Sequence, residues 1–163
     1  FDSATQVPLL LWILAILTMT LGNVLALLQD NIRRMLAYSS VAHGGYMLMG
    51  IVVASSLPDA KSAPGVGGMD AILVYLAAYG MMTVGAFAVI LFLSTPERPV
   101  ESIEDLAGAG QSNPVSAAAM AVFLFSLIGL PLTAGFAGKL MLFVGAFNAP
   151  SDSATMRNLY QVM

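Results

Sequence analysis

Long apolar runs, separated by short polar connections, make up most of this sequence of 163 residues. A helix needs about 20 largely apolar residues to cross the hydrocarbon core of a bilayer. Three such runs lie at residues 8–28, 35–57 and 69–93, and the Pro8 that opens the first suits the first turn of a helix. The pattern predicts an all-α polytopic membrane protein, in which a further helix begins near residue 157.

A fourth apolar run is too long for one ordinary crossing. It extends over 34 residues, from Pro114 to Phe147. One continuous helix of that length would measure about 51 Å, whereas the hydrocarbon core is about 30 Å thick. The run must therefore tilt strongly, bend or break.

The middle of this fourth run reads Gly-Leu-Pro-Leu-Thr-Ala-Gly. Pro131 removes a backbone donor and clashes with the preceding turn, while the flanking Gly129 and Gly135 loosen the backbone further. We predict a discontinuous helix with halves at about 114–129 and 135–148, in preference to a simple proline kink. Interrupted backbone at membrane depth persists only where protein buries it or where it lines a hydrated cavity.

The composition indicates a lipid environment and excludes several kinds of functional site. The chain is 58% hydrophobic and 9% charged, whereas soluble domains carry about 25% charged residues. A net charge of -3 argues against a nucleic-acid partner. The sequence has no Cys, which excludes disulfides and thiolate ligands, and its one His cannot build a metal site alone. We expect no metal site in this chain.

The charged residues collect in the connections between the apolar runs. Connections 29–34 and 94–113 together carry three arginines, while connection 58–68 carries one lysine. Alternate connections face the same side of a membrane, and the positive-inside rule places the arginine-rich side in the cytoplasm. The acidic residues at 101–105 do not oppose this orientation, because acidic residues contribute little to it.

Lys139 is the most informative residue for function. It follows the predicted break and has no acidic residue within ten positions along the chain. A lysine in mid-membrane costs roughly 2.5–3.5 kcal/mol on insertion scales, and desolvation brings its titration toward neutral pH. Lys139 is therefore a candidate proton relay. A lysine near a helix end can also extend its amine to the interface, and the pattern alone does not separate these alternatives.

His43 is the other titratable candidate for proton transfer inside an apolar run. Ser39, Ser40 and Tyr46 lie three and four positions from it, so that face of the helix is polar. Either a proton-path role or a neutral imidazole bonded to a neighbour fits this pattern. Tyr75 and Tyr79 form an i, i+4 pair in the third run, which favours a packed helix interface over a hydrated path.

Arg33 and Arg34 precede the second apolar run. An arginine stays protonated in proteins, so neither side chain can pass a proton. We expect Arg34 to anchor the chain among lipid headgroups, and Arg33 to act as a fixed charge.

Two long motifs resemble the antiporter-like subunits of respiratory complex I. One reads Asn-Ile-Arg-Arg-Met-Leu-Ala-Tyr-Ser-Ser from Asn31 to Ser40, where the family usually has Asn-x-Lys-Arg-x-Leu-Ala-Tyr-Ser-Ser. The other is the broken-helix segment from Gly129 to Lys139. The resemblance covers nearly the whole chain. His43 in Ala-His-Gly-Gly-Tyr, and a third run without His or Lys, resemble the subunit N family of NADH-quinone oxidoreductases rather than the larger subunits L and M.

This resemblance implies an internal fragment of a bundle of about fourteen helices with two inverted repeats. In such a subunit protons and water move through buried lysines and histidines, with Lys139 and His43 as relays. It implies no redox cofactor in this chain, because NADH, FMN, iron–sulfur clusters and quinone belong to other subunits of the complex. Those membrane subunits and the lipid bilayer are the expected partners, and a bacterial inner membrane is the expected location.

The sequence departs from the family pattern at two positions. Arg33 stands where the family has lysine, and Leu132 stands where it has a second proline, which is expected to soften the break. Two other functions remain open. One is a subunit of a related cation/proton antiporter or membrane-bound hydrogenase, and the other is a structural membrane scaffold without a proton path.

Overall fold

The computed structural model describes residues 3–56 and 68–147, and all its regular elements are helices. The predicted helix near residue 157, and most of the second connection, lie outside the described residues. The long helices are α1 (Ser3–Leu27), α2 (Ile32–Ser56) and α3 (Gly68–Leu93), followed by two shorter ones, α5 (Pro114–Ile128) and α6 (Ala134–Phe147). Between α3 and α5 lie a 3-10 turn, η1 (Glu104–Leu106), and α4 (Ala109–Ser112). The expected all-α architecture with a discontinuous helix is confirmed.

Two of the helices begin earlier than hydrophobicity suggested. Helix α1 starts at Ser3, so Pro8 lies inside it and not in its first turn. Helix α2 starts at Ile32 rather than at residue 35, because Asn31 caps it. The Asn31 side-chain oxygen accepts hydrogen bonds from the amides of Arg33 and Arg34, both at 3.1 Å. Hydrophobicity marks where lipid begins, whereas such a cap marks where helical hydrogen bonding begins.

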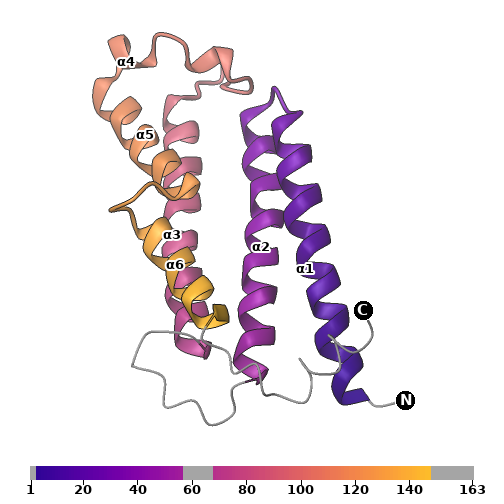
Figure 1. Ribbon diagram of the computed structural model, residues 1–163. Helices are drawn as coiled ribbons and strands as arrows, with labels where there is room; N and C mark the ends of the chain where they lie inside the picture. The colour runs from indigo at the N-terminus through magenta and orange to yellow at the C-terminus, as the bar shows by residue number, and fades with distance from the viewer. Residues whose placement is uncertain (1–2, 57–67, 148–163) are drawn as a thin grey trace.

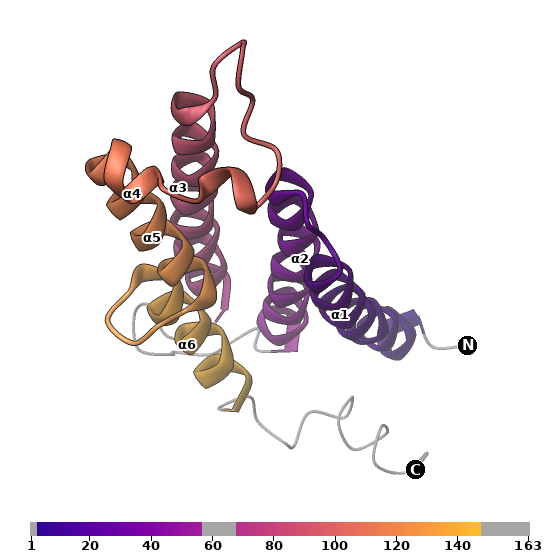
Figure 2. The same ribbon diagram turned by 90° about the horizontal axis from the view of Figure 1, so that it is seen from above.

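The helices run side by side along one common direction, and α5 and α6 together occupy the length of one helix (Figure 1). Helix α1 packs against α2, α2 contacts α3 and α6, and α3 contacts both α5 and α6. Seen from above, α2 lies between α1 and the group of α3, α5 and α6 (Figure 2). Helix α3 is therefore the element against which both halves of the broken helix pack.

Three helices in the described part of the chain are long and apolar enough to cross a membrane. Their apolar spans are Val7–Leu27, Ile32–Ala54 and Met69–Leu93. Large apolar side chains such as Leu10, Val84 and Phe92 are 58%, 69% and 72% exposed on the outside of this bundle. Such an exposed apolar surface suits a lipid environment or contact with further helices.

Two apolar clusters fill the interior at different levels of the bundle. One lies toward the α1–α2 turn and includes Leu36, Met82 and Ile90. The other lies toward the opposite end and includes Met49, Ile72 and Leu142. The middle of α2 and α3 lies between these clusters, and it is there that polar side chains enter the interior.

The connection after α3 joins the α1–α2 turn at one end of the bundle. The amide of Ile32 donates to the carbonyl of Glu101 at 2.9 Å, and the amide of Ile103 donates to that of Asp30 at 3.1 Å. Within this connection, hydrogen bonds from the Ser102 and Glu101 amides lower the pKa of the exposed Asp105 carboxyl. The first and third connections therefore share a face, as alternating crossings require.

Candidate functional site

The break between α5 and α6 is stabilised by groups from both half-helices. Helix α5 ends at Gly129, whose φ of 89° lies in the left-handed region, and the amides of Gly129 and Leu130 both donate to the carbonyl of Phe125 at 3.1 Å. This pattern is the usual glycine stop of a helix. The non-helical segment comprises residues 129–133. The break therefore forms fully, although Leu132 replaces the proline that was expected to reinforce it.

Each half-helix then satisfies polar groups of the other. The buried Ser126 near the end of α5 accepts a hydrogen bond at 3.2 Å from the amide of Gly135 in the first turn of α6. A Cβ atom on Gly135 would collide with the carbonyl oxygen of Ser126, so only glycine permits this approach. An amide at the start of α6 is thus paired inside the protein with a side chain of α5, as a hydrocarbon environment requires.

Lys139 completes this pairing from the second turn of α6. Its Nζ donates to the carbonyl oxygens of Leu127 and Ile128, at 3.0 Å and 3.1 Å. Both carbonyls belong to the last turn of α5, where intrahelical donors are missing and the helix dipole is negative. The half-buried amine is therefore directed back toward the break.

His43 lies in the interior near the middle of α2 and is 4% exposed. Its Nδ1 and the hydroxyl oxygen of Tyr75 are 2.5 Å apart, and this hydrogen bond joins α2 to α3. The ring of Tyr79, also on α3, stacks on the imidazole at a centroid distance of 4.5 Å. The histidine is therefore held both at one ring nitrogen and across one ring face.

Tyr46 connects the histidine with the lysine. Its ring lies edge-on to His43 at a centroid distance of 5.9 Å, and the Nζ of Lys139 lies 5.4 Å from its centroid. A cation over an aromatic face is stabilised by about 0.5–2 kcal/mol. The three helices α2, α3 and α6 thus place one imidazole, one amine and three phenol rings in a single cluster, hereafter the His43–Lys139 cluster (His43, Tyr46, Tyr75, Tyr79 and Lys139).

The structure brings some of the predicted site residues together and separates others. His43 and Lys139 meet in the His43–Lys139 cluster, and Gly129 and Gly135 shape the break beside it. Pro131 lies on the exposed side of the break. Arg33 and Arg34 lie in the first turn of α2, far along the helix from His43, so they are not part of this cluster.

Sequence reasoning assigned Tyr75 to a packed helix interface and missed its hydrogen bond to His43. The i, i+4 pair of tyrosines marked one polar face of α3, but its facing partner lies 32 positions away in the sequence. Ser126 was missed altogether, because one serine in an apolar run has no distinctive spacing. These contacts depend on how the helices are rotated against one another.

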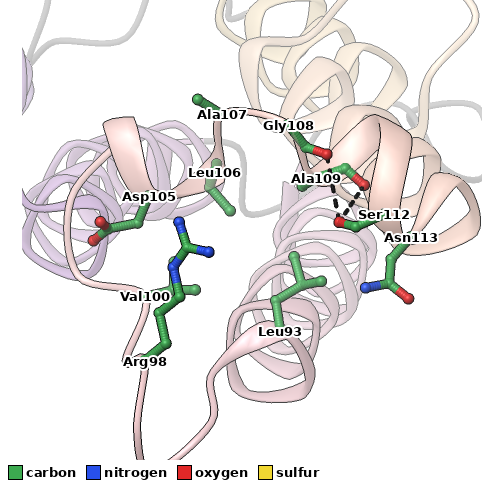
Figure 3. Close-up of a pocket in the computed structure, with 10 residues that line it drawn as sticks. All are labelled: Leu93, Arg98, Val100, Asp105, Leu106, Ala107, Gly108, Ala109, Ser112 and Asn113. Atoms are coloured by element: carbon green, nitrogen blue, oxygen red, sulfur yellow. Dashed lines mark hydrogen bonds between the residues drawn. The ribbon is translucent and has the colours of Figure 1, made fainter.

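A separate pocket of about 330 Å³ lies in the connection between α3 and α5, at the end of the bundle. Figure 3 shows the guanidinium of Arg98 extending toward Asp105 and Leu106 along one wall of this pocket. It shares no lining residue with the His43–Lys139 cluster.

These features define a polytopic α-helical membrane protein with a discontinuous helix and ionisable side chains in its interior. The chain belongs to the family described as NADH:quinone oxidoreductase/Mrp antiporter, transmembrane, whose family model matches residues 2–160.

Among curated proteins, the chain is similar to one particular subunit of this family. The chain is 51% identical over 140 residues to NADH-quinone oxidoreductase subunit N of Trichlorobacter lovleyi, covering 86% of this chain and 27% of that protein. It is 46% identical over 144 residues to subunit N 1 of Herpetosiphon aurantiacus, covering 88% and 27%. It is also 46% identical over 137 residues to subunit N of Rhodospirillum rubrum, covering 84% and 26%. The chain spans about a quarter of the length of these relatives.

Proposed function

We propose that this chain forms part of the proton path of an NADH-quinone oxidoreductase membrane subunit of the N type. The observation that carries the proposal is the Lys139 amine, held at the end of a broken helix and beside the buried His43. The names of the curated relatives support the assignment to this complex. Coupling of NADH oxidation and quinone reduction to proton export would then be the activity of the complete assembly.

The hydrogen-bond geometry of Lys139 suits reversible protonation. An ammonium group has three N–H donors, and the α5 carbonyls of Leu127 and Ile128 take two of them. The third is available for exchange. A neutral amine retains two N–H donors, so both carbonyls can stay satisfied when the proton leaves. The break can therefore persist through a protonation cycle, while the charge beside Tyr46 and His43 changes.

His43 supplies a second proton-accepting group in the same interior. Neutral imidazole has one acceptor and one donor nitrogen, which allows a proton to enter at one atom and leave at the other. In our proposal Lys139 and His43 are the relays, and the tyrosines hold them in place. Redox chemistry would reside in other subunits, with NADH, FMN, iron–sulfur clusters and quinone, and the bacterial inner membrane would hold the assembly.

Two alternative functions differ from this proposal in the residues and partner subunits that they require. A scaffold without a proton path has no need for an amine in a membrane interior, where it costs roughly 2.5–3.5 kcal/mol. A related antiporter or hydrogenase subunit would use the same relay residues with other partner subunits. Purifying the complex and identifying its NADH-oxidising or hydrogen-evolving subunits separates these possibilities.

The experiment compares Lys139→Arg with Lys139→Ala in the full-length subunit of the assembled complex. Arginine retains charge and donors for the α5 carbonyls but cannot release a proton. We expect both variants to lower proton pumping per NADH oxidised by about tenfold or more, whereas Lys139→Arg retains normal assembly. NADH oxidation with a water-soluble acceptor measures the amount of complex. Normal pumping by Lys139→Arg would show that the lysine only caps the break.

A further inference from the structure

Tyr75 is the most completely buried polar side chain of the His43–Lys139 cluster. It is 0% exposed, and its hydroxyl lies 2.5 Å from Nδ1 of His43. A buried tyrosine hydroxyl needs a hydrogen-bond partner, and this imidazole nitrogen provides it. The contact therefore satisfies two buried polar groups at once.

This hydrogen bond determines which nitrogen of His43 remains free. Nδ1 is engaged by Tyr75, and within residues 3–56 and 68–147 Nε2 has no hydrogen-bond partner. Stacking on Tyr79, with an angle of 24° between the rings, opposes rotation of the imidazole. The two ring nitrogens of a histidine differ in their proton occupancy according to the bond that the other one makes. Nε2 is thus the atom of His43 that exchanges with other groups.

Tyr75 also lies directly against the helix that carries the lysine. A Cβ atom on Gly138 would come within 2.8 Å of Cδ2 of Tyr75 and within 3.4 Å of its Cα. Only glycine allows the backbone of α6 to approach α3 so closely here. The residue that precedes Lys139 therefore rests on the same ring whose hydroxyl holds His43.

We propose that Tyr75 is a positioning residue of the proton path, which engages Nδ1 of His43 and sets the orientation of the imidazole relative to α6. This inference rests on the proposed function of Lys139 and His43 as relays. Tyr75 itself does not carry the proton. Its hydroxyl keeps Nδ1 engaged, so that exchange takes place at Nε2, and its ring maintains the spacing between the histidine and the lysine-bearing helix.

The titratable groups facing His43 are few. They are Tyr46 on the same helix, Tyr75 and Tyr79 on α3, and Lys139 on α6. Helices α1 and α5 carry no acidic, basic or tyrosine side chain in their described sequences. A change in the pH dependence of pumping after alteration of Tyr75 therefore reports on this cluster.

The test uses Tyr75→Phe in the full-length subunit of the assembled complex, with Tyr38→Phe as matched control. Both changes keep the ring, but only Tyr75→Phe removes a hydrogen bond, since the hydroxyl of Tyr38, which lies outside the His43–Lys139 cluster, has no partner among the described residues. We expect Tyr75→Phe to lower proton pumping about three- to tenfold and to displace its pH midpoint by roughly half a unit to one unit. Tyr38→Phe should leave both quantities near their original values.

A His43→Ala background distinguishes positioning from direct participation. If Tyr75 acts through His43, Tyr75→Phe adds no further loss once His43→Ala is present. A persistent additional loss, unchanged pumping and midpoint in Tyr75→Phe alone, or normal pumping in His43→Ala would each overturn the inference. None of these outcomes contradicts the role of Lys139, which Lys139→Arg tests separately.

Discussion

The lysine of the broken helix illustrates how a single residue becomes tolerable in a membrane interior. Placing Lys139 there costs roughly 2.5–3.5 kcal/mol. Two hydrogen bonds from a charged donor, at about 1.5 kcal/mol each, are of the same size. The carbonyls that accept them lack helical partners because the helix breaks beside them. Lys139 and the break therefore depend on each other. The amine needs acceptors inside the protein, and the last carbonyls of α5 need donors because the helix ends there.

Arg33 presents the opposite case, a charge that its own helix disfavours. It lies in the first turn of α2, where the helix dipole is positive and a cation costs about 0.3–1 kcal/mol. Among the described residues its guanidinium donates one hydrogen bond, of 3.4 Å, to the hydroxyl of Ser94. Helix stability therefore does not explain a cation at this position, whereas the expected role as a fixed positive charge does.

We predict that Arg33→Lys retains most proton pumping, while Arg33→Gln and Arg33→Ala lower it several-fold. Lysine keeps the charge, glutamine keeps hydrogen bonding without charge, and alanine keeps neither. The charge can act on His43 about 15 Å along the helix, because screening is weaker inside a membrane than in water. Pumping per NADH in vesicles measures the effect. An equal loss in Arg33→Lys and Arg33→Ala would instead show a need for guanidinium hydrogen bonding.

At the scale of elements, the halves of the broken helix are joined by side chains more than by the segment between them. Ser126 on α5 receives the amide of Gly135, and Lys139 on α6 reaches the last carbonyls of α5. These exchanges cap both half-helices inside the protein. Movement of one half must therefore disturb the hydrogen bonds of the other.

We predict that Gly135→Ala disrupts the break and reduces both assembly and pumping. The added Cβ collides with the backbone carbonyl of Ser126, and backbone cannot move aside as a side-chain end can. Overpacking of this kind costs about 1–3 kcal/mol. Gly80→Ala is the matched control, because a Cβ there meets no atom within 4 Å. The amount of intact complex in native gels and pumping in vesicles are the measurements. Normal values for Gly135→Ala would show that the half-helices are not so closely apposed.

At the scale of the whole molecule, two connections form one surface at the end of the bundle that holds Arg33 and Arg34. The Asn31–Ser102 pairing and the hydrogen bonds beside it join the α1–α2 turn to the connection after α3. The side of the membrane that this surface faces follows from the arginine count, which favours the cytoplasm.

We predict that a cysteine at Ser102 is labelled only from the cytoplasmic side. An impermeant thiol reagent added to intact cells should fail to react with Ser102→Cys but should react after the membrane is opened. Met69→Cys is the control, because this residue lies in the first turn of α3, at the opposite end of the bundle, and is 60% exposed in this chain. Labelling of Ser102→Cys in intact cells would show that the orientation is opposite to the one predicted.

The sequence by itself determined where the chain crosses the membrane and where one crossing breaks. Apolar length sets the first because lipid cannot hydrate backbone or charge. Pro131 between two glycines sets the second because it removes a donor and the glycines permit the turn. Lys139 and His43 stood out for the same reason, since titratable groups in an apolar run are costly. Capping by Asn31 was not evident from hydrophobicity, and for that reason α2 began earlier than predicted.

Only the tertiary structure decided which groups these candidates meet. Tyr75 contacts His43 because α2 and α3 are rotated to face each other across 32 positions of sequence. Lys139 reaches the end of α5 because α6 follows α5 along one line and the break leaves the last carbonyls of α5 without helical donors. Periodicity within a helix gives the polar face but not the partner that the face meets. That choice depends on the packing of all the helices together, in which Gly135 and Gly138 allow α6 to approach α5 and α3 closely.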